Sequence, residues 1–418
     1  MLDRKRLRNE PGAIEAAIAA KNEKAHIDKW LASDGHRREL MLQVEELRSL
    51  RNNLSRTVSL KKRQGENADA VMEESREAGK QLVLLEKEMS ELDVELAAME
   101  MSFPNVPDAD VPVGGEESNV VVKTAGVLPE FSFQPLPHWE LMKDVFLPED
   151  AGKVTGSNFI LFRGWAAKLQ RTLINWMLDH HTDNGMEEVW PPFLANTDSM
   201  TATAQLPKMA DDMYEVNRDG LFLIPTGEVP ITNLYRNRLV EERELPIKLC
   251  GYSPCFRREA GSYGKDTRGL NRVHQFEKVE MVRFEHPEKS DEAHMEMVDH
   301  VTGMLDILNI PWRVLLLATG DLSFAAARCY DIEIWSAGQE KWLEVSSVSN
   351  FRDFQARRGS IRFRPDGGGK PQFVHTLNGS GMALPRLIIS LVENNQREDG
   401  SITLPSVIAE RMGVDLIR

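Results

Sequence analysis

Apolar residues recur at spacings of three, four and seven over residues 36–103, a segment that is otherwise rich in Glu, Lys and Arg. Such spacing places them on one stripe of a helix. The residues on the stripe are Leu40, Val44, Leu47, Leu54 and Val58, followed by Val71, Ala78, Leu82, Leu85, Met89, Leu92, Leu96 and Met99. A polar break with a glycine, RQGEN, separates the two groups near Gly65. The pattern predicts an antiparallel hairpin in which each helix buries its stripe against the other.

The predicted turn of this hairpin carries a cluster of positive charge. Arg56, Lys61, Lys62 and Arg63 lie within RTVSLKKRQGE, beside the turn. On the heptad pattern alone, a dimerisation coiled coil or a rigid spacer is the more common use of such a hairpin. A basic tip on an outstretched arm is suited instead to contact with a phosphate backbone. Both interpretations stay open on these residues.

A proline-rich stretch, PNVPDADVPVGG, ends the helical segment, and the composition changes after it. A chain of 418 residues exceeds what one hydrophobic core usually covers. We therefore expect a helical domain at residues 1–103, a linker at 104–116 and a second domain at 117–418. In the second domain, apolar runs such as GLFLIPT, VHQFEKVEMVRFE and KWLEVSSVSNF follow one another with few helices between them. This order predicts an antiparallel sheet flanked by helices, so the expected fold class is α+β.

Charge and composition limit the classes of protein to which the chain can belong. The formal net charge of −14 argues against bulk nonspecific affinity for nucleic acid, although it leaves room for a local basic surface. No apolar run reaches the length of a membrane span, and the first residues lack the apolar core of a secretory signal. We therefore expect a cytoplasmic protein without a membrane segment. The cysteines, Cys250, Cys255 and Cys329, form no C-x-x-C pair, so we expect neither a disulfide framework nor zinc.

The stretch FRRE, which begins at Phe256, concentrates guanidinium groups in an acidic chain. Neither a GxxxxGK[ST] loop nor a GxGxxG turn is present, so any bound nucleotide must be held by side chains. On a strand, Arg257 and Glu259 would share one face, where a bidentate guanidinium and a carboxylate suit a phosphate and a base edge. An exposed ladder of ion pairs is the alternative, and this stretch alone does not decide between them.

Longer stretches resemble the conserved motifs of one enzyme family. CFRREAGSYGKDTRGLNRVHQFEKVEMV is similar to motif 2 of the class II aminoacyl-tRNA synthetases, in the form that seryl-tRNA synthetases have. NGMEEVWPPF resembles motif 1, which forms the dimer interface in that family, and HTLNGSGMALPRLIISLVENNQ resembles motif 3. IPTGEVPITN resembles the serine-binding loop of the family, and YDIEIWSAGQEKWLEVSSVSNFRDFQARR resembles its metal and nucleotide strands. The helical arm matches as well, so the resemblance covers essentially the whole chain.

The resemblance implies a set of ATP-binding residues. They are Arg257, Arg258, Glu259, Arg272, Phe276, Glu344, Val345, Ser346, Ser347 and Arg386. Arg257 would hold the α-phosphate together with the substrate carboxylate, and Arg386 is the second implied catalytic residue. Glu259 would accept from the adenine amino group and Phe276 would stack on the ring, while Arg272 and Arg386 would clamp the γ-phosphate and the other adenine face. The same resemblance makes Glu344 and Ser347 the implied Mg²⁺ ligands.

A serine pocket is implied as well. Its residues are Thr226, Gly227, Glu228, Glu280 and Ser380. Two carboxylates suit an ammonium and a hydroxyl group, so alanine would be rejected for its missing hydroxyl and threonine by shape. The chain departs from the commonest family pattern at Gly227, Ser323, Cys329 and Leu384-Pro385. Of these departures, Pro385 puts in doubt how the helix that carries Arg386 begins.

The expected activity is the activation of L-serine with ATP, followed by transfer of the seryl group to tRNA(Ser), with tRNA(Sec) as a further candidate. The expected partners are ATP, L-serine, tRNA and a second copy of the chain, and Mg²⁺ is the expected cofactor. Lys265 and Arg268 would meet the acceptor end of the RNA. Two alternatives remain: a serine-activating ligase that loads a carrier protein, and a noncatalytic RNA-binding paralogue.

Overall fold

The computed structural model describes residues 1–260 and 268–418, and Lys265 lies outside the described residues. The chain forms two compact units, Leu2–Pro104 and Asn105–Arg418, with Met1 grouped with the second. The boundary between the units falls within the proline-rich stretch. Within the described ranges, no helix is both long and apolar enough to cross a lipid bilayer.

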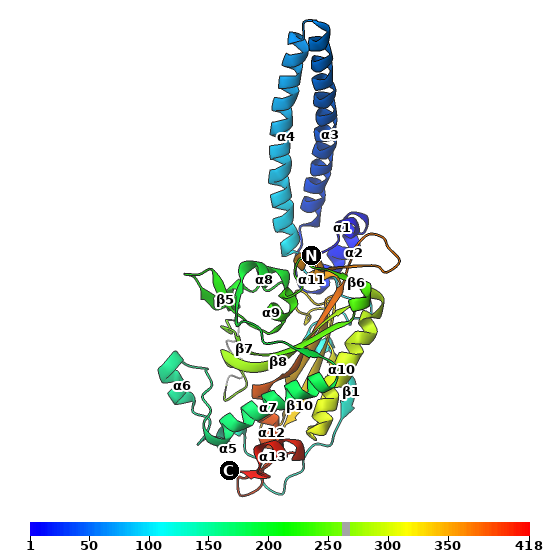
Figure 1. Ribbon diagram of the computed structural model, residues 1–418. Coiled ribbons are helices and arrows are strands. Elements are labelled where there is room, and N and C mark those ends of the chain that lie inside the picture. Colours follow the sequence, from blue (N-terminus) through cyan, green and yellow to red (C-terminus); the bar gives the residue numbers. More distant parts are fainter. Residues whose placement is uncertain (261–267) are drawn as a thin grey trace. The chain divides into compact units, whose positions relative to one another are not determined.

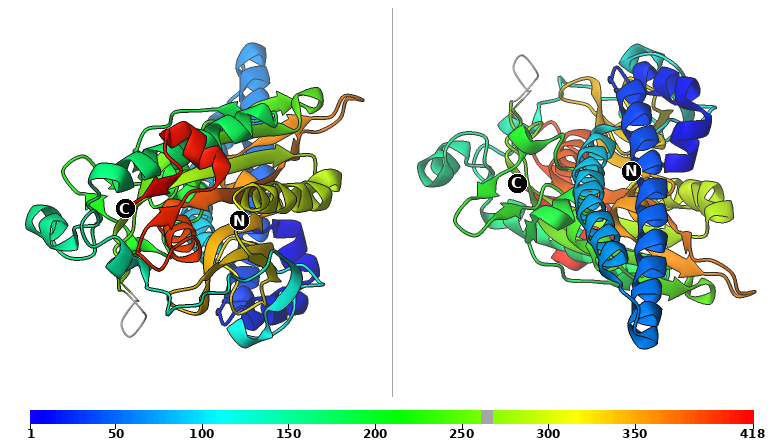
Figure 2. Two further views of the ribbon diagram at one scale, coloured as in Figure 1. Left: turned by 90° about the horizontal axis from the view of Figure 1, so that it is seen from below. Right: turned by 90° about the horizontal axis from the view of Figure 1, so that it is seen from above.

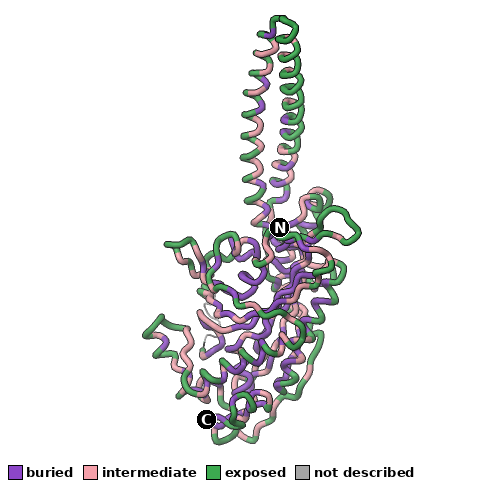
Figure 3. The backbone as a smooth tube through the Cα atoms, viewed as in Figure 1, coloured by how far each residue is buried: buried purple, intermediate pink, exposed green. Residues whose placement is uncertain are grey.

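The first unit is built around a hairpin of two long helices, α3 (Ile27–Gln64) and α4 (Asp69–Ser102), which run side by side. Gly65 ends α3 with a φ of 72°, a left-handed conformation that glycine adopts without steric cost. Every residue of the predicted stripe is buried or partly buried, as the purple and pink segments of Figure 3 show for both helices. The predicted hairpin is therefore confirmed. Two short helices, α1 (Arg4–Asn9) and α2 (Pro11–Ala20), precede it.

Helix α3 begins at Ile27, nearer the N-terminus than the heptad pattern predicts. The difference arises because the apolar spacing is interrupted: after the buried Ile27 and Trp30, the next buried residue is Asp34. Asp34 is fully buried and accepts hydrogen bonds from Arg8 Nε and Nη2, at 2.7 and 2.8 Å. The indole of Trp30 donates to Glu100 at 2.9 Å. A pattern that counts only apolar residues therefore breaks at Asp34, although the helix and its buried face continue.

The second unit contains an eight-stranded sheet with the strand order β1-β9-β10-β11-β14-β8-β7-β2. The strands are β1 (Val120–Ala125), β2 (Glu187–Glu188), β7 (Ile247–Phe256), β8 (Gln275–Glu285), β9 (Trp312–Leu316), β10 (Arg328–Ser336), β11 (Lys341–Asn350) and β14 (His375–Ala383). Neighbouring strands are antiparallel except for the edge pair β2 and β7. The predicted α+β class with an antiparallel sheet is confirmed.

Helices α7 (Gly164–Asp183), α10 (Ser290–Ile307) and α12 (Leu384–Asn394) pack against this sheet and share one hydrophobic core with it. Figure 2 shows these helices lying against the strands. The alternation along β8 gives the two faces of the sheet different characters. Val279 and Met281 belong to the helix-covered core, whereas Lys278 and Glu280 point away from it. One face of the strand is therefore committed to packing and the other carries charge.

Smaller elements complete the unit. The helices are α5 (His138–Leu141), α6 (Pro148–Thr155), α8 (Thr197–Ala202), α9 (Glu228–Asn233), α11 (Phe354–Gly359) and α13 (Ser406–Met412), with the 3-10 helices η1 (Glu116–Ser118), η2 (Ala210–Asp212), η3 (Glu242–Glu244) and η4 (Pro287–Lys289). The strands are β3 (Leu194–Asn196), β4 (Glu215–Val216), β5 (Leu221–Leu223), β6 (Leu239–Glu241), β12 (Arg362–Arg364), β13 (Gln372–Phe373), β15 (Ile402–Thr403) and β16 (Leu416–Ile417), which form three small sheets.

Candidate active site

A cavity of about 180 Å³ opens on the face of the sheet that carries Lys278. Its lining comes from the segments that flank and include β7, β8, β11, β14 and the start of α12. The residues are Arg257, Glu259, Leu270, Asn271, Arg272, Val273, Phe276, Lys278, Glu344, Val345, Ser380, Ala383, Pro385 and Arg386. Most of the residues that we predicted to bind ATP therefore lie around one cavity, although they are far apart in the sequence.

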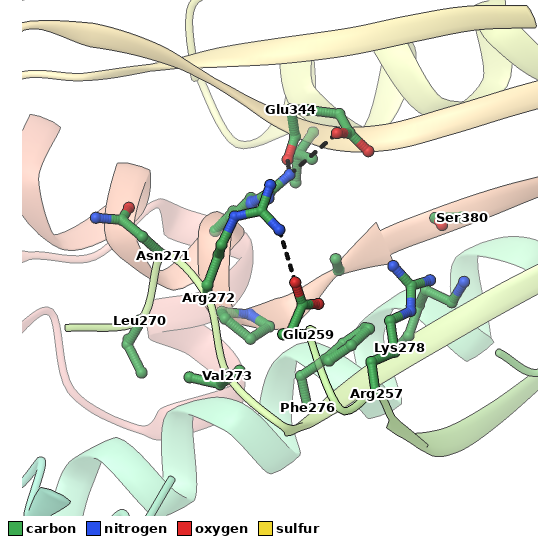
Figure 4. Close-up of a pocket in the computed structure, with 14 residues that line it drawn as sticks. Arg257, Glu259, Leu270, Asn271, Arg272, Val273, Phe276, Lys278, Glu344 and Ser380 are labelled. Atoms are coloured by element: carbon green, nitrogen blue, oxygen red, sulfur yellow. Dashed lines mark hydrogen bonds and ion pairs between the residues drawn. The ribbon is translucent and has the colours of Figure 1, made fainter. Parts of the chain in front are cut away.

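Three guanidinium groups converge on the cavity, and two carboxylates hold two of them. Arg272 Nη1 lies 2.6 Å from Glu259 Oε2, as the dashed line in Figure 4 shows. Arg386 Nη1 donates to the backbone carbonyl of Glu344 at 2.7 Å and to its carboxylate at 3.2 Å. The guanidinium carbon of Arg257 lies 5.2 Å from the centre of the Phe276 ring. This excess of fixed cations, beside an aromatic face, suits a ligand that carries both phosphates and a base.

Arg257 and Glu259 reach the cavity by a different route from the one predicted. Strand β7 ends at Phe256, so these two residues do not alternate on a strand. Glu259 instead has a φ of 52°, in the left-handed region. Arg258, which we predicted to bind ATP, does not line the cavity. Its backbone N–H donates to Asp212 O at 2.9 Å and its Nη1 to Asp211 O at 3.1 Å, so its side chain anchors this segment to a neighbouring one.

Glu280 is the most enclosed of the predicted serine-binding residues. Its side chain is fully buried on β8. Thr226 Oγ1 donates to Glu280 Oε2 at 2.8 Å, and Asn378 Nδ2 donates to Oε1 at 3.2 Å. Lys278 forms an ion pair with Glu280 and donates to Thr226 Oγ1 at 2.9 Å. The buried charge is thus compensated by three partners, as a buried carboxylate requires.

A second buried carboxylate, Glu228, lies close to Glu280. Gln355 Nε2 donates to Glu228 Oε1 at 2.6 Å. Burial, and then the charge of Glu280, raise the pKa of Glu228 to about 7, while Gln355, Lys278 and Arg257 act in the opposite direction. At Gly227 an added Cβ would lie 3.0 Å from Glu280 Cβ, so the small residue lets the loop approach β8 closely. Two buried carboxylates thus lie close together on this face, and Lys278 already forms an ion pair with one of them.

The predicted serines of β11 and β14 occupy different places. Ser380 lines the cavity and lies opposite Glu280 in the register of β14 and β8. Ser346 is buried and donates to the carbonyl oxygen of Ser380 at 2.6 Å, so its side chain supports β14 and does not line the cavity. Ser347 does not line it either, and its Oγ lies 3.0 Å from Cys329 Sγ.

Glu344 lies between this cavity and a second, larger one of about 630 Å³ that also contains Asp321, Asp331 and Glu333. Asp331 faces Ser347 in the register of β10 and β11. Burial and the charge of Glu344 raise the pKa of Asp331 well above its usual range. Within the described ranges, no group of three or more His, Cys, Asp or Glu side chains is arranged to hold a metal ion. Of the two implied Mg²⁺ ligands, Glu344 lines both cavities, whereas Ser347 lines neither, and its hydroxyl would have to leave Cys329 to join Glu344 at a cation.

Comparisons with known proteins decide the family. Residues 1–107 match the model of the seryl-tRNA synthetase N-terminal domain, and residues 212–395 match the tRNA synthetase class II core domain (G, H, P, S and T). A serine–tRNA ligase of Thermomicrobium roseum is 46% identical over 99% of this chain and 94% of its own length. One from Desulfitobacterium hafniense is 44% identical over all of both chains. The chain belongs to the seryl-tRNA synthetase family.

Solved structures agree with this assignment. The crystal structure of the seryl-tRNA synthetase from Pyrococcus horikoshii, complexed with ATP, superposes with a TM-score of 0.95 at 33% identity and covers 100% of this chain and 99% of that one. A cytoplasmic serine–tRNA ligase from Naegleria fowleri, in complex with AMP, has a TM-score of 0.90 at 26% identity, with the same coverage. The whole chain, including the helical arm, therefore has the fold of a seryl-tRNA synthetase.

Several residues at the seryl-tRNA synthetase site were missed by sequence reasoning. They are Leu270, Asn271, Val273, Lys278, Ala383 and Pro385. Lys278 could have been found, because the period of two along β8 places it on the same face as Phe276 and Glu280. Pro385 lies in the first turn of α12, where a proline costs no hydrogen bond, so the helix begins normally at Leu384 and Arg386 follows in that turn.

Proposed function

We propose that the protein is a serine–tRNA ligase that forms seryl-adenylate in the cavity around Arg257 and then transfers the seryl group to tRNA(Ser). The observation that carries the proposal is the adjacency of two sites. Lys278 lines the arginine-rich cavity and also forms an ion pair with Glu280, one of the two buried carboxylates. The buried carboxylates that we propose to bind the ammonium group of serine thus lie directly beside the proposed site for the triphosphate.

The arrangement supports in-line attack without a nucleophilic side chain. A carboxylate oxygen of serine attacks the α-phosphorus of ATP, the bond from that phosphorus to the bridging oxygen breaks, and pyrophosphate leaves. Arg257 would hold the substrate carboxylate against the α-phosphate, which raises the effective concentration of the reacting groups and offsets the developing charge. The terminal ribose hydroxyl of the tRNA then attacks the carbonyl carbon, and AMP leaves.

We infer that ATP is bound with Mg²⁺, held by Glu344 and Ser347. The bound cation would neutralise phosphate charge during transfer. Arg272 and Arg386 already point toward the same cavity, held by Glu259 and Glu344. These two carboxylates would release the guanidinium groups to the phosphates and the adenine ring when the nucleotide enters.

The serine pocket leads to a prediction about specificity. Replacing Glu280 with glutamine should raise the KM for serine and relax discrimination against alanine by about tenfold, because a hydrogen bond to a charged group contributes about 1.5–3 kcal/mol. The measurement is the ratio of kcat/KM values for the two amino acids in ATP–pyrophosphate exchange.

A matched control for this substitution lies on the same strand. Glu277 faces the other side of β8, where Tyr252 donates a hydrogen bond to it. Glu277→Gln should leave the ratio of serine to alanine unchanged. An unaltered ratio in the Glu280→Gln variant would remove Glu280 from the serine pocket.

The raised pKa of Glu228 leads to a prediction about pH. The carboxyl group is mostly neutral below about pH 7 and ionised above it, and only the ionised form attracts an ammonium group. The kcat/KM for serine should therefore rise with pH through about 7, whereas the Glu228→Gln variant should be less active and lack this rise. Pyrophosphate exchange at fixed ATP, from about pH 6 to about pH 8, measures the profile. An identical pH profile in both proteins would show that another group titrates.

Contact of the helical arm with tRNA belongs to the same proposal. Lys62 and Arg63 are exposed at the tip of the hairpin, which supports contact with the phosphate backbone of the tRNA. Arg268 lies 4.4 Å from the centre of the Trp139 ring and 3.6 Å from Glu140, so contact with the acceptor end would require it to leave these partners. The homodimer, the cytoplasmic location and service to tRNA(Sec) stay predictions.

The test of the proposal is serine-dependent ATP–pyrophosphate exchange by the purified chain, with each of the other standard amino acids as controls. Exchange that requires serine supports it, and no exchange under any condition would favour a noncatalytic paralogue. A carrier-protein ligase would also give exchange but would not charge tRNA. The comparisons lend no support to either alternative, since the relatives named above are serine–tRNA ligases along their whole length.

A further inference from the structure

A buried histidine and a buried glutamate form a pair beside the proposed ATP cavity. His138 begins α5 and Glu393 lies near the end of α12, and both side chains are fully buried. His138 Nδ1 lies 2.8 Å from Glu393 Oε1, and the backbone N–H of His138 donates to the same oxygen at 2.8 Å. The other carboxylate oxygen accepts from Gly338 N at 3.0 Å. Glu393 is therefore fixed by several donors.

The second ring nitrogen of His138 holds a loop. The backbone N–H of Leu270 donates to His138 Nε2 at 2.9 Å. Because Nε2 accepts this bond, the proton of the neutral ring lies on Nδ1, which donates to Glu393. Hydrogen bonds are thus donated from the backbone of Leu270 to His138, and from His138 to Glu393.

The loop that His138 holds forms part of the ATP cavity. Leu270, Asn271, Arg272 and Val273 are consecutive and all line it. Asn271 provides a second link, because its Nδ2 donates to Gln339 Oε1 at 2.8 Å and Gln339 Nε2 lies 3.4 Å from Glu393 Oε1. Glu393 is therefore connected to this segment at two successive residues.

The packing at this junction is close. An added Cβ at Gly269 would lie 2.1 Å from His138 Nε2, and Gly269 has a φ of 67°. Only glycine therefore lets the loop approach the ring closely enough for Leu270 to donate. Gly269 and His138 together fix the position of the backbone at Leu270.

We propose that His138 and Glu393 are positioning residues for nucleotide binding, which set Arg272 and Val273 against the cavity through the backbone of Leu270. The inference rests on the proposed function, since the ligand that would report it is ATP. Neither residue touches the cavity, so both act through the loop. The residues that we propose to bind serine lie on β8, on β14 and at the start of α9 with the two residues before it, outside the segment that His138 holds.

The test uses the substitution His138→Asn, because the shorter amide can still donate toward Glu393 while it loses the acceptor for Leu270. We expect the KM for ATP to rise about tenfold or more in serine-dependent exchange, with the KM for serine changed less than about twofold. The Kd for ATP without serine, measured by calorimetry, should rise by the same factor. His138→Gln places an amide oxygen near the position of Nε2 and should restore most of the affinity.

Two further variants separate positioning from a loss of stability. Ser390→Ala removes another buried hydrogen bond of α12, to Trp335 O at 2.7 Å, without a contact to the loop, and should leave both KM values unchanged. Gly269→Ala disturbs the same junction from the loop side and should reproduce the His138→Asn result, even if the latter variant does not fold.

Equal increases in both KM values, or an unchanged Kd for ATP in folded His138→Asn and in Gly269→Ala, would overturn the inference. The wild-type protein distinguishes this outcome from failure of the proposed function, because without serine-dependent exchange in the wild type the function itself is wrong.

Discussion

Replacing Arg257 with alanine is expected to lower serine-dependent pyrophosphate exchange by about a thousandfold, mainly through kcat. Arg257 lines the cavity, and its Nε donates to Pro225 O at 3.3 Å, one residue before Thr226 of the serine pocket. In the proposed function, this side chain lies where the carboxylate of serine would meet the α-phosphate. Its loss would remove both the alignment of the reactants and a charge that stabilises the transition state. Pre-steady-state measurement of adenylate formation separates this effect from product release.

The neighbouring arginine provides the control. Arg258 donates to the backbone of Asp211, and its side chain is outside the cavity. Arg258→Ala should reduce exchange only by a few-fold, through the anchoring of its segment. Comparable losses in the two variants would contradict the assignment of Arg257 to the reacting phosphate.

Deleting residues 40–98 and closing the gap with a short glycine-rich turn is expected to separate the two half-reactions. Pyrophosphate exchange should remain within a few-fold of wild type, because the deleted residues belong to the first unit while the cavity lies in the second. Charging of tRNA should fall by several orders of magnitude, since the basic tip is lost. The polar base of the hairpin, where Arg8 binds Asp34 and Trp30 binds Glu100, is retained.

A milder variant tests the same division of labour without shortening the chain. Replacing Lys62 and Arg63 with glutamate should weaken tRNA binding and reduce its dependence on salt, while exchange stays unchanged. If exchange and charging fall together in the deletion variant, the arm is a structural element and not an RNA-binding one.

The elements that could be predicted from the sequence are those whose pattern has one dominant cause. The hairpin was predicted from an apolar stripe that keeps helical spacing over many residues. The strands were predicted from short apolar runs without intervening helices. The start of α3 was missed because Asp34, which continues the buried face of Ile27 and Trp30, is buried with a charged partner, Arg8. Such pairs lie far apart in the sequence, so no local window contains them.

The site residues also divide into those with a local sequence signal and those without one. Arg272, Phe276 and Arg386 were named from motifs, and the structure places them around one cavity. Arg257 and Glu259 were placed on a continuing strand, but β7 ends at Phe256. Arg258 was predicted to bind ATP, although its side chain is bonded to Asp211. His138 and Glu393 left no local signal, because their partner Leu270 lies 132 residues from His138 along the chain. Long-range hydrogen bonds of this kind appear only when the fold is known.

The most direct test of the central claim is the charging of tRNA(Ser) by the intact chain with labelled serine, ATP and Mg²⁺. The proposed function predicts seryl-tRNA(Ser) that forms only when serine, ATP and tRNA(Ser) are all present, with alanine and threonine giving little product. Serine-dependent pyrophosphate exchange without any charged tRNA(Ser) would contradict it and would favour a carrier-protein ligase.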